Sequence, residues 1–262
     1  MTEGLAVETL LPFGSRTAGD RTRVYGFPHA GGEHSAYGRF ALELAPEFDF
    51  QPVRLPRGGM LPDGRASDDP RALVPALGAA LSGELRPPYV LFGHSMGAVL
   101  AAELTAWLEC QALAGPELLI VSACAGGQAG WVRPTEIERD DGALTQWVLG
   151  LGGTDPALLA DMEMRSLVLD GLRHDLRLLH AYRPTYRRLT TPVLALGGVR
   201  DPRVRETDLG RWQERTTAAF RLRMFPGGHF YLYEHARAIA GEISRMLTAA
   251  RAAQPGEPQE RR

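Results

Sequence analysis

The sequence contains no lysine, and every one of its 29 basic residues is arginine. Because arginine neither forms a Schiff base nor serves as a tunable general base, chemistry that depends on a lysine amine is excluded. Cysteine is scarce as well: Cys110 and Cys124 show neither a Cys-x-x-Cys spacing nor a Cys/His pattern typical of a metal site. We expect both to be small, buried and unpaired residues in a reducing compartment.

Long apolar runs are also missing. No stretch approaches the roughly 18 consecutive apolar residues of a membrane span, and acidic Glu3 and Glu8 interrupt the region where a signal peptide would be apolar. A net charge of −2 gives no general attraction to nucleic acid or to an anionic membrane. Neither a G-x-G-x-x-G motif nor a P-loop occurs. We therefore predict a cytoplasmic protein that needs no metal or cofactor and binds neither nucleic acid nor membrane.

The sequence does contain apolar segments with strand character that alternate with segments of helical periodicity. The predicted strands cover residues 22–27, 50–55, 89–92, 117–123, 191–196 and 221–225. The predicted helices of this core cover residues 36–44, 70–85, 98–109 and 234–250. Such alternation favours a mostly parallel sheet flanked by helices, so we expect a single α/β domain over residues 1–262.

Residues 126–189 interrupt this alternation, because they contain no convincing strand. Helices are predicted instead at 142–151, 156–164 and 166–181. In the last of them Leu169, Leu172, Leu176 and Leu179 form one apolar stripe. This insertion is either packed permanently on the core or a helical lid over a substrate pocket; its place between core strands favours the lid. We expect residues 251–262 to be a disordered tail.

The pentapeptide Gly93-His94-Ser95-Met96-Gly97 lies between an apolar strand and a predicted helix. In a strand–turn–helix of this kind the two glycines allow a sharp turn, and the serine projects from it as a nucleophile. The alternative is a structural turn whose serine only caps the helix. The flanking strand and helix favour the nucleophile.

A serine nucleophile needs a base to take its proton and an acid to orient that base. Asp201 and His229 each follow a predicted core strand, and the order Ser95, Asp201, His229 is typical of an α/β-hydrolase. We therefore assign His229 as the base and Asp201 as the acid, with Glu206 and Asp208 as the nearest alternatives to Asp201.

Backbone N–H groups are expected to stabilise the oxyanion. One belongs to Met96, which follows the nucleophile, and the second to Ala30, in the glycine-rich loop of residues 28–32. The alternative for this loop is a tight turn without a chemical role.

Together these residues resemble the type II thioesterases that accompany polyketide synthases and nonribosomal peptide synthetases. The resemblance is carried by Phe27-Pro28-His29-Ala30-Gly31-Gly32, by residues 88–98 around Ser95, by Leu151-Gly152-Gly153-Thr154, and by residues 225–230 around His229. It implies an α/β-hydrolase with a helical lid that removes acyl groups from the phosphopantetheine thiol of acyl or peptidyl carrier proteins, an editing reaction. The phosphopantetheine belongs to the substrate.

The chain departs from the pattern of this family at residues 56–59 and at 122–127, and both departures concern the shape of the pocket. Two alternative functions use the same acyl-enzyme: an acyltransferase and an oxygen-ester hydrolase. A third is a carrier-binding protein that keeps the hydrolase shape without turnover. Four arginines are candidates for meeting an acidic carrier helix: Arg65, Arg133, Arg173 and Arg177.

Overall fold

Six parallel strands form one sheet in the order β2-β1-β3-β4-β5-β6. The computed structural model describes residues 10–12, 21–56, 61, 70–127, 132–183, 185 and 187–253. The strands are β1 (Thr22–Phe27), β2 (Phe48–Pro52), β3 (Tyr89–His94), β4 (Leu118–Ser122), β5 (Val193–Gly198) and β6 (Phe220–Phe225). The predicted fold class is therefore confirmed. Most of the predicted loop at 56–62 and of the lead-in at 1–20 lies outside the described residues.

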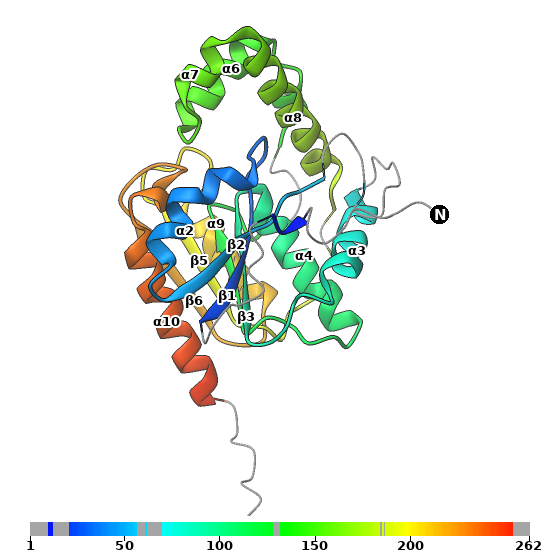
Figure 1. Ribbon diagram of the computed structural model, residues 1–262, viewed down its shortest axis with the longest axis vertical. Helices are drawn as coiled ribbons and strands as arrows, with labels where there is room; N and C mark the ends of the chain where they lie inside the picture. Colours follow the sequence, from blue (N-terminus) through cyan, green and yellow to red (C-terminus); the bar gives the residue numbers. More distant parts are fainter. Residues whose placement is uncertain are drawn as a thin grey trace, which may run out of the picture.

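Successive residues of each central strand point to opposite faces of the sheet, and both faces are buried. In β3, Tyr89 and Leu91 join one apolar core, whereas Val90 and Phe92 join the other. This explains why β3 reads as a continuous apolar run, as expected for a parallel sheet covered on both sides. Helices α3 and α4 pack on the first face, and α2 and α10 on the second (Figure 1).

The core helices are α2 (Gly38–Leu44), α3 (Pro70–Leu81), α4 (Met96–Cys110), α9 (Glu206–Gly210) and α10 (Ala236–Ala253). Helix α3 ends earlier than predicted, before Ser82 and Gly83. Helix α10 continues to Ala253 and so includes the start of the segment expected to be disordered; residues 254–262 lie outside the described part.

In its described residues, the insertion between β4 and β5 contains four helices: α5 (Pro134–Ile137), α6 (Asp141–Leu151), α7 (Pro156–Ala160) and α8 (Met162–Ala181). Figure 1 shows α6, α7 and α8 arching over one end of the sheet. The break between α7 and α8 falls at Asp161, whose carboxylate accepts N–H bonds from Glu163 and Met164 at 2.9 Å and begins a new helix. The four leucines of the predicted stripe are all buried.

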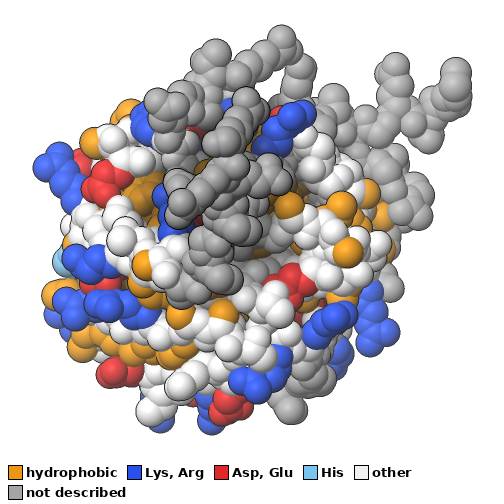
Figure 2. Space-filling view, turned by 90° about the horizontal axis from the view of Figure 1, so that it is seen from below, with side chains coloured by type: hydrophobic (Ala, Val, Ile, Leu, Met, Phe, Trp, Pro, Cys, Tyr) orange, Lys and Arg blue, Asp and Glu red, His pale blue; other side chains and the backbone are white. Residues whose placement is uncertain are grey.

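Across the described ranges, no helix combines the length and the apolar character that crossing a membrane requires. In the part of Figure 2 that is not grey, arginine side chains lie around the edge of the face, with single acidic side chains between some of them.

Candidate active site

Ser95 lies at the turn between β3 and α4, in a backbone conformation that side-chain-bearing residues rarely adopt (φ 54°, ψ −115°). The glycines on either side make this turn possible. A Cβ atom on Gly93 would lie 2.1 Å from the carbonyl oxygen of Gly97, and one on Gly97 would lie 2.0 Å from that of Phe27. The N–H of Ser95 donates to the carbonyl of Ser122 at 2.8 Å, which ties the turn to β4.

His229 and Asp201 form a buried pair at the ends of β6 and β5. Nδ1 of His229 lies 2.8 Å from Oδ2 of Asp201, and the two side chains are 4% and 0% exposed. Because a carboxylate only accepts hydrogen bonds, Nδ1 carries the proton and Nε2 remains available to act as a base. The other oxygen of Asp201 accepts the backbone N–H of Arg203 at 2.8 Å, so both carboxylate oxygens have fixed partners.

Neither alternative to Asp201 is paired with His229, although Asp208 and His229 line the same cavity. Asp208 accepts the N–H of Arg205 at 3.2 Å, at the start of α9. Glu206 lies in the first turn of the same helix. The structure therefore brings Asp201, and neither alternative, to the imidazole of His229.

One cavity of about 440 Å³ brings the sequence-predicted residues together: Ser95, His229, Ala30 and Met96 all line it. Much of the remaining lining is apolar and comes from the insertion and from α4, including Val99, Val148, Leu172, Leu176 and Leu179. The cavity therefore places an apolar chamber beside a serine and an imidazole.

The backbone around the cavity offers N–H donors at two places. Met96 is the first residue of α4, where N–H groups have no partner within the helix. Ala30 lies in a tight turn closed by the N–H of Gly32, which donates to the carbonyl of His29 at 2.9 Å. Gly31 has a φ of 71°, the left-handed conformation that the third position of a type II turn requires.

Two further histidines lie near His229, and no sequence pattern assigned them a role in the site. The ring centroids of His94 and His229 are 5.1 Å apart, and those of His29 and His94 6.1 Å. Burial, and then the nearby His229, lower the pKa of His29 to about 3 and hold that of His94 well below its ordinary value. Both rings are therefore neutral at pH 7. His94 Nδ1 is 2.8 Å from the Ser122 hydroxyl, which contacts the hydroxyl of Tyr231.

Arg203 links the loop of Asp201 to the insertion, a connection that no sequence pattern indicated. Its guanidinium donates to Glu136 of α5 at 2.7 Å and lies 5.2 Å from the ring centre of Trp147 of α6. Burial alone would raise the pKa of Glu136, but hydrogen bonds from Arg203 and from the N–H of Arg133 outweigh it and lower that pKa. The buried carboxylate is thus ionised and paired.

Cys124 also lines the cavity, but burial raises the pKa of its thiol to about 12. A thiol that stays protonated is a poor nucleophile, so Cys124 does not compete with Ser95. Neither Cys110 nor Cys124 is in a disulfide; Cys124 is buried as predicted, whereas the prediction was wrong for Cys110, which is exposed at the end of α4. Within the described part of the chain, no cluster of His, Cys, Asp or Glu has the geometry to hold a metal ion.

A parallel sheet with a strained serine turn and a buried Asp–His pair at its edge defines the α/β-hydrolase class. Within this class the chain belongs to the thioesterase family, because residues 22–247 match the family model described as "Thioesterase domain".

Individual relatives agree with this assignment. The chain is 36% identical to the probable cadicidin biosynthesis thioesterase of Streptomyces griseus, over 89% of this chain and 64% of that protein. It is 34% identical to thioesterase PikA5 of Streptomyces venezuelae, over 88% and 83% of the two chains. The solved structure of BorB, a type II thioesterase of the borrelidin biosynthetic cluster, superposes with a TM-score of 0.74 at 35% identity, covering 87% and 93% of the two chains.

Proposed function

We propose that this protein is an editing thioesterase that hydrolyses acyl groups from the phosphopantetheine thiol of carrier proteins in a polyketide or nonribosomal peptide synthase. The observation that carries the proposal is that Ser95, His229, Ala30 and Met96 line the same cavity. The relatives named for biosynthetic pathways favour a carrier-bound thioester as the substrate.

In the proposed mechanism, Ser95 Oγ attacks the thioester carbonyl while Nε2 of His229 takes the hydroxyl proton. Asp201 stabilises the imidazolium through its 2.8 Å contact with Nδ1. The N–H groups of Ala30 and Met96 donate to the oxyanion, as in other acyl-transfer sites. The intermediate collapses, the thiol leaves with the proton from His229, and an acyl-enzyme remains. His229 then activates water, which releases the acid. No cofactor takes part.

We also propose that exposed arginines recognise the carrier protein, and the structure reduces the four candidates named from the sequence. The side chain of Arg173 is 18% exposed and bound to Asp141, so it contributes to the packing of the insertion. Arg133 is 73% exposed on the rim of the cavity and remains a candidate for contact with an acidic carrier helix. Arg177 is also exposed. Arg65 lies outside the described residues.

The test compares a panel of acyl groups carried on pantetheine and on carrier protein, with products identified by mass spectrometry. We expect free acid as the product and a higher kcat/KM for the carrier-bound form. Acyl transfer to an added alcohol or amine would indicate an acyltransferase instead. Faster hydrolysis of matched oxygen esters would indicate an esterase, and carrier binding without turnover would contradict catalysis.

A further inference from the structure

Helix α8 of the insertion contacts the turn that contains Ala30. The carboxylate of Asp175 accepts the backbone N–H of Gly31 at 2.7 Å, across 144 positions of sequence. Leu172, on the neighbouring turn of α8, packs so closely that a Cβ atom on Gly31 would lie 3.2 Å from the Cβ of Leu172. Helix α8 therefore covers this turn through one hydrogen bond and through close packing of an apolar side chain.

This contact fixes the peptide group that follows Ala30. The bond from Gly32 to His29 closes the turn but leaves the central peptide, which carries the Gly31 N–H, free to rotate. With glycine at the third position such a peptide can flip between turn types at low cost. An acceptor at 2.7 Å holds one orientation. Asp175 therefore holds the peptide that adjoins Ala30, directly next to the peptide that carries the Ala30 N–H.

We propose that Asp175 is a positioning residue for the oxyanion hole, and that it couples the geometry of the hole to the seating of α8 on the core. The role rests on the proposed function, because it assigns the Ala30 N–H to the oxyanion. Misplacing one donor by a fraction of an ångström weakens stabilisation of the transition state more than binding of the substrate.

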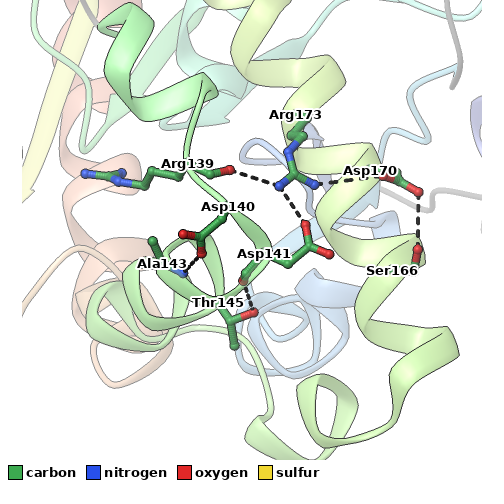
Figure 3. Close-up of polar contacts among 8 residues, drawn as sticks. All are labelled: Arg139, Asp140, Asp141, Ala143, Thr145, Ser166, Asp170 and Arg173. Atoms are coloured by element: carbon green, nitrogen blue, oxygen red, sulfur yellow. Dashed lines mark hydrogen bonds and ion pairs between the residues drawn. The ribbon is translucent and has the colours of Figure 1, made fainter.

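The other charged contacts of α8 provide matched controls. Figure 3 shows Arg173, on the same helix, donating to Asp141 at 2.7 Å and to the carbonyl of Arg139 at 3.0 Å. These bonds hold α8 to the start of α6 and do not involve Gly31. Asp170 is 74% exposed and 4.0 Å from Arg173, so its substitution changes the charge of α8 without touching the turn.

The experiment measures kcat and KM of Asp175→Ala and Asp175→Asn on a small acyl-pantetheine thioester. It also measures the affinity of each variant for a trifluoromethyl ketone, which forms an oxyanion with the serine. We expect Asp175→Ala to lower kcat about tenfold and to change KM less than about twofold. Its affinity for the ketone should fall about as much as kcat does. Asp175→Asn keeps an oxygen acceptor without the charge and should restore kcat. Asp175→Ser, which is too short to reach Gly31, replaces the alanine variant if that variant does not fold.

Asp170→Asn should leave kcat and ketone affinity unchanged, and Arg173→Met should affect both less than Asp175→Ala does. The proposal is overturned if Asp175→Ala keeps native ketone affinity, or if Arg173→Met reproduces its losses, because general loosening of the insertion would then explain them. Absence of thioester hydrolysis in the unaltered protein would contradict the proposed function instead. Ketone affinity reports on Asp175 separately, since it requires no turnover.

Discussion

Gly93 and Gly97 flank Ser95 so tightly that neither position has room for a side chain. The strained turn is therefore stabilised by its surroundings: the sheet on one side, through the bond from Ser95 to Ser122, and the backbone at Phe27 on the other. At the residue scale, the position of the nucleophile depends on backbone contacts more than on the chemistry of its neighbours.

Gly97→Ala tests this dependence. Its new Cβ would lie 2.0 Å from the carbonyl oxygen of Phe27, so we expect the free energy of unfolding to fall by at least about 2 kcal/mol. Urea denaturation provides the measurement. Gly150→Ala, in α6, meets no atom within 4 Å and should be neutral or stabilising by up to about 1 kcal/mol. Equal stabilities for the two variants would show that the close approach of Gly97 to Phe27 does not exclude a side chain at position 97.

The neutral histidines make a pH-dependent contribution to stability. The pKa of His29 is about 3, that of His94 is also lowered, and the unfolded chain takes up protons near pH 6.5. Stability from each ring is therefore complete above about pH 6.5 and is lost as pH falls below it, by about 1.4 kcal/mol per pH unit.

Urea denaturation at pH 7 and pH 5 measures this loss. His29→Gln should reduce the difference in unfolding free energy between the two pH values, because glutamine does not titrate. The unaltered chain serves as the reference. If His29→Gln leaves the difference unchanged, the buried His29 ring makes no pH-dependent contribution to stability.

At the scale of elements, the ion pair between Glu136 and Arg203 joins α5 to the loop that carries Asp201. The carboxylate is 3% exposed, so a variant that removes Arg203 leaves a buried charge without its main partner. We expect Arg203→Met to lower the free energy of unfolding by about 3 kcal/mol. Arg203→Met with Glu136→Met should recover much of the loss, since it removes both charges.

Arg237→Met is the matched surface control. It breaks a pair with Glu43 in which the arginine is 86% exposed, and should cost less than about 1 kcal/mol. Thermal and urea denaturation of the four proteins, including the unaltered chain, distinguish these outcomes. A loss from Arg203→Met no larger than that from Arg237→Met would show that the buried pair does not fix the loop.

The sequence predicted those features that are marked by a pattern of neighbouring residues in the chain. The turn at Ser95 was predictable because two glycines and a serine follow an apolar strand, and Asp201 and His229 because each follows a strand in the expected order. The contacts of Arg203 with Glu136 and of Asp175 with Gly31 were not predictable, because they join segments far apart in the chain. The short helices α5 and α9 were missed, since neither is long enough to show a periodicity.

At the scale of the whole molecule, the insertion and the sheet edge enclose the cavity together. Leu176 of α8 is 2% exposed and lines it. We expect Leu176→Ala to enlarge the chamber and to shift the kcat/KM optimum toward longer acyl chains, with a loss of about 2–5 kcal/mol in stability. A panel of acyl-pantetheines of increasing length measures the shift. An unchanged dependence of kcat/KM on chain length would show that the acyl chain does not bind against Leu176.

The most direct test of Ser95 as the nucleophile compares hydrolysis of an acyl carrier protein by the unaltered chain and by Ser95→Ala, followed by intact-mass analysis of the enzyme. If Ser95 forms the acyl-enzyme, the variant loses turnover by about 10³-fold or more. An acyl adduct is also expected on Ser95 in the unaltered chain, and none in Ser95→Ala. Hydrolysis at a near-native rate by Ser95→Ala would rule out Ser95 as the nucleophile.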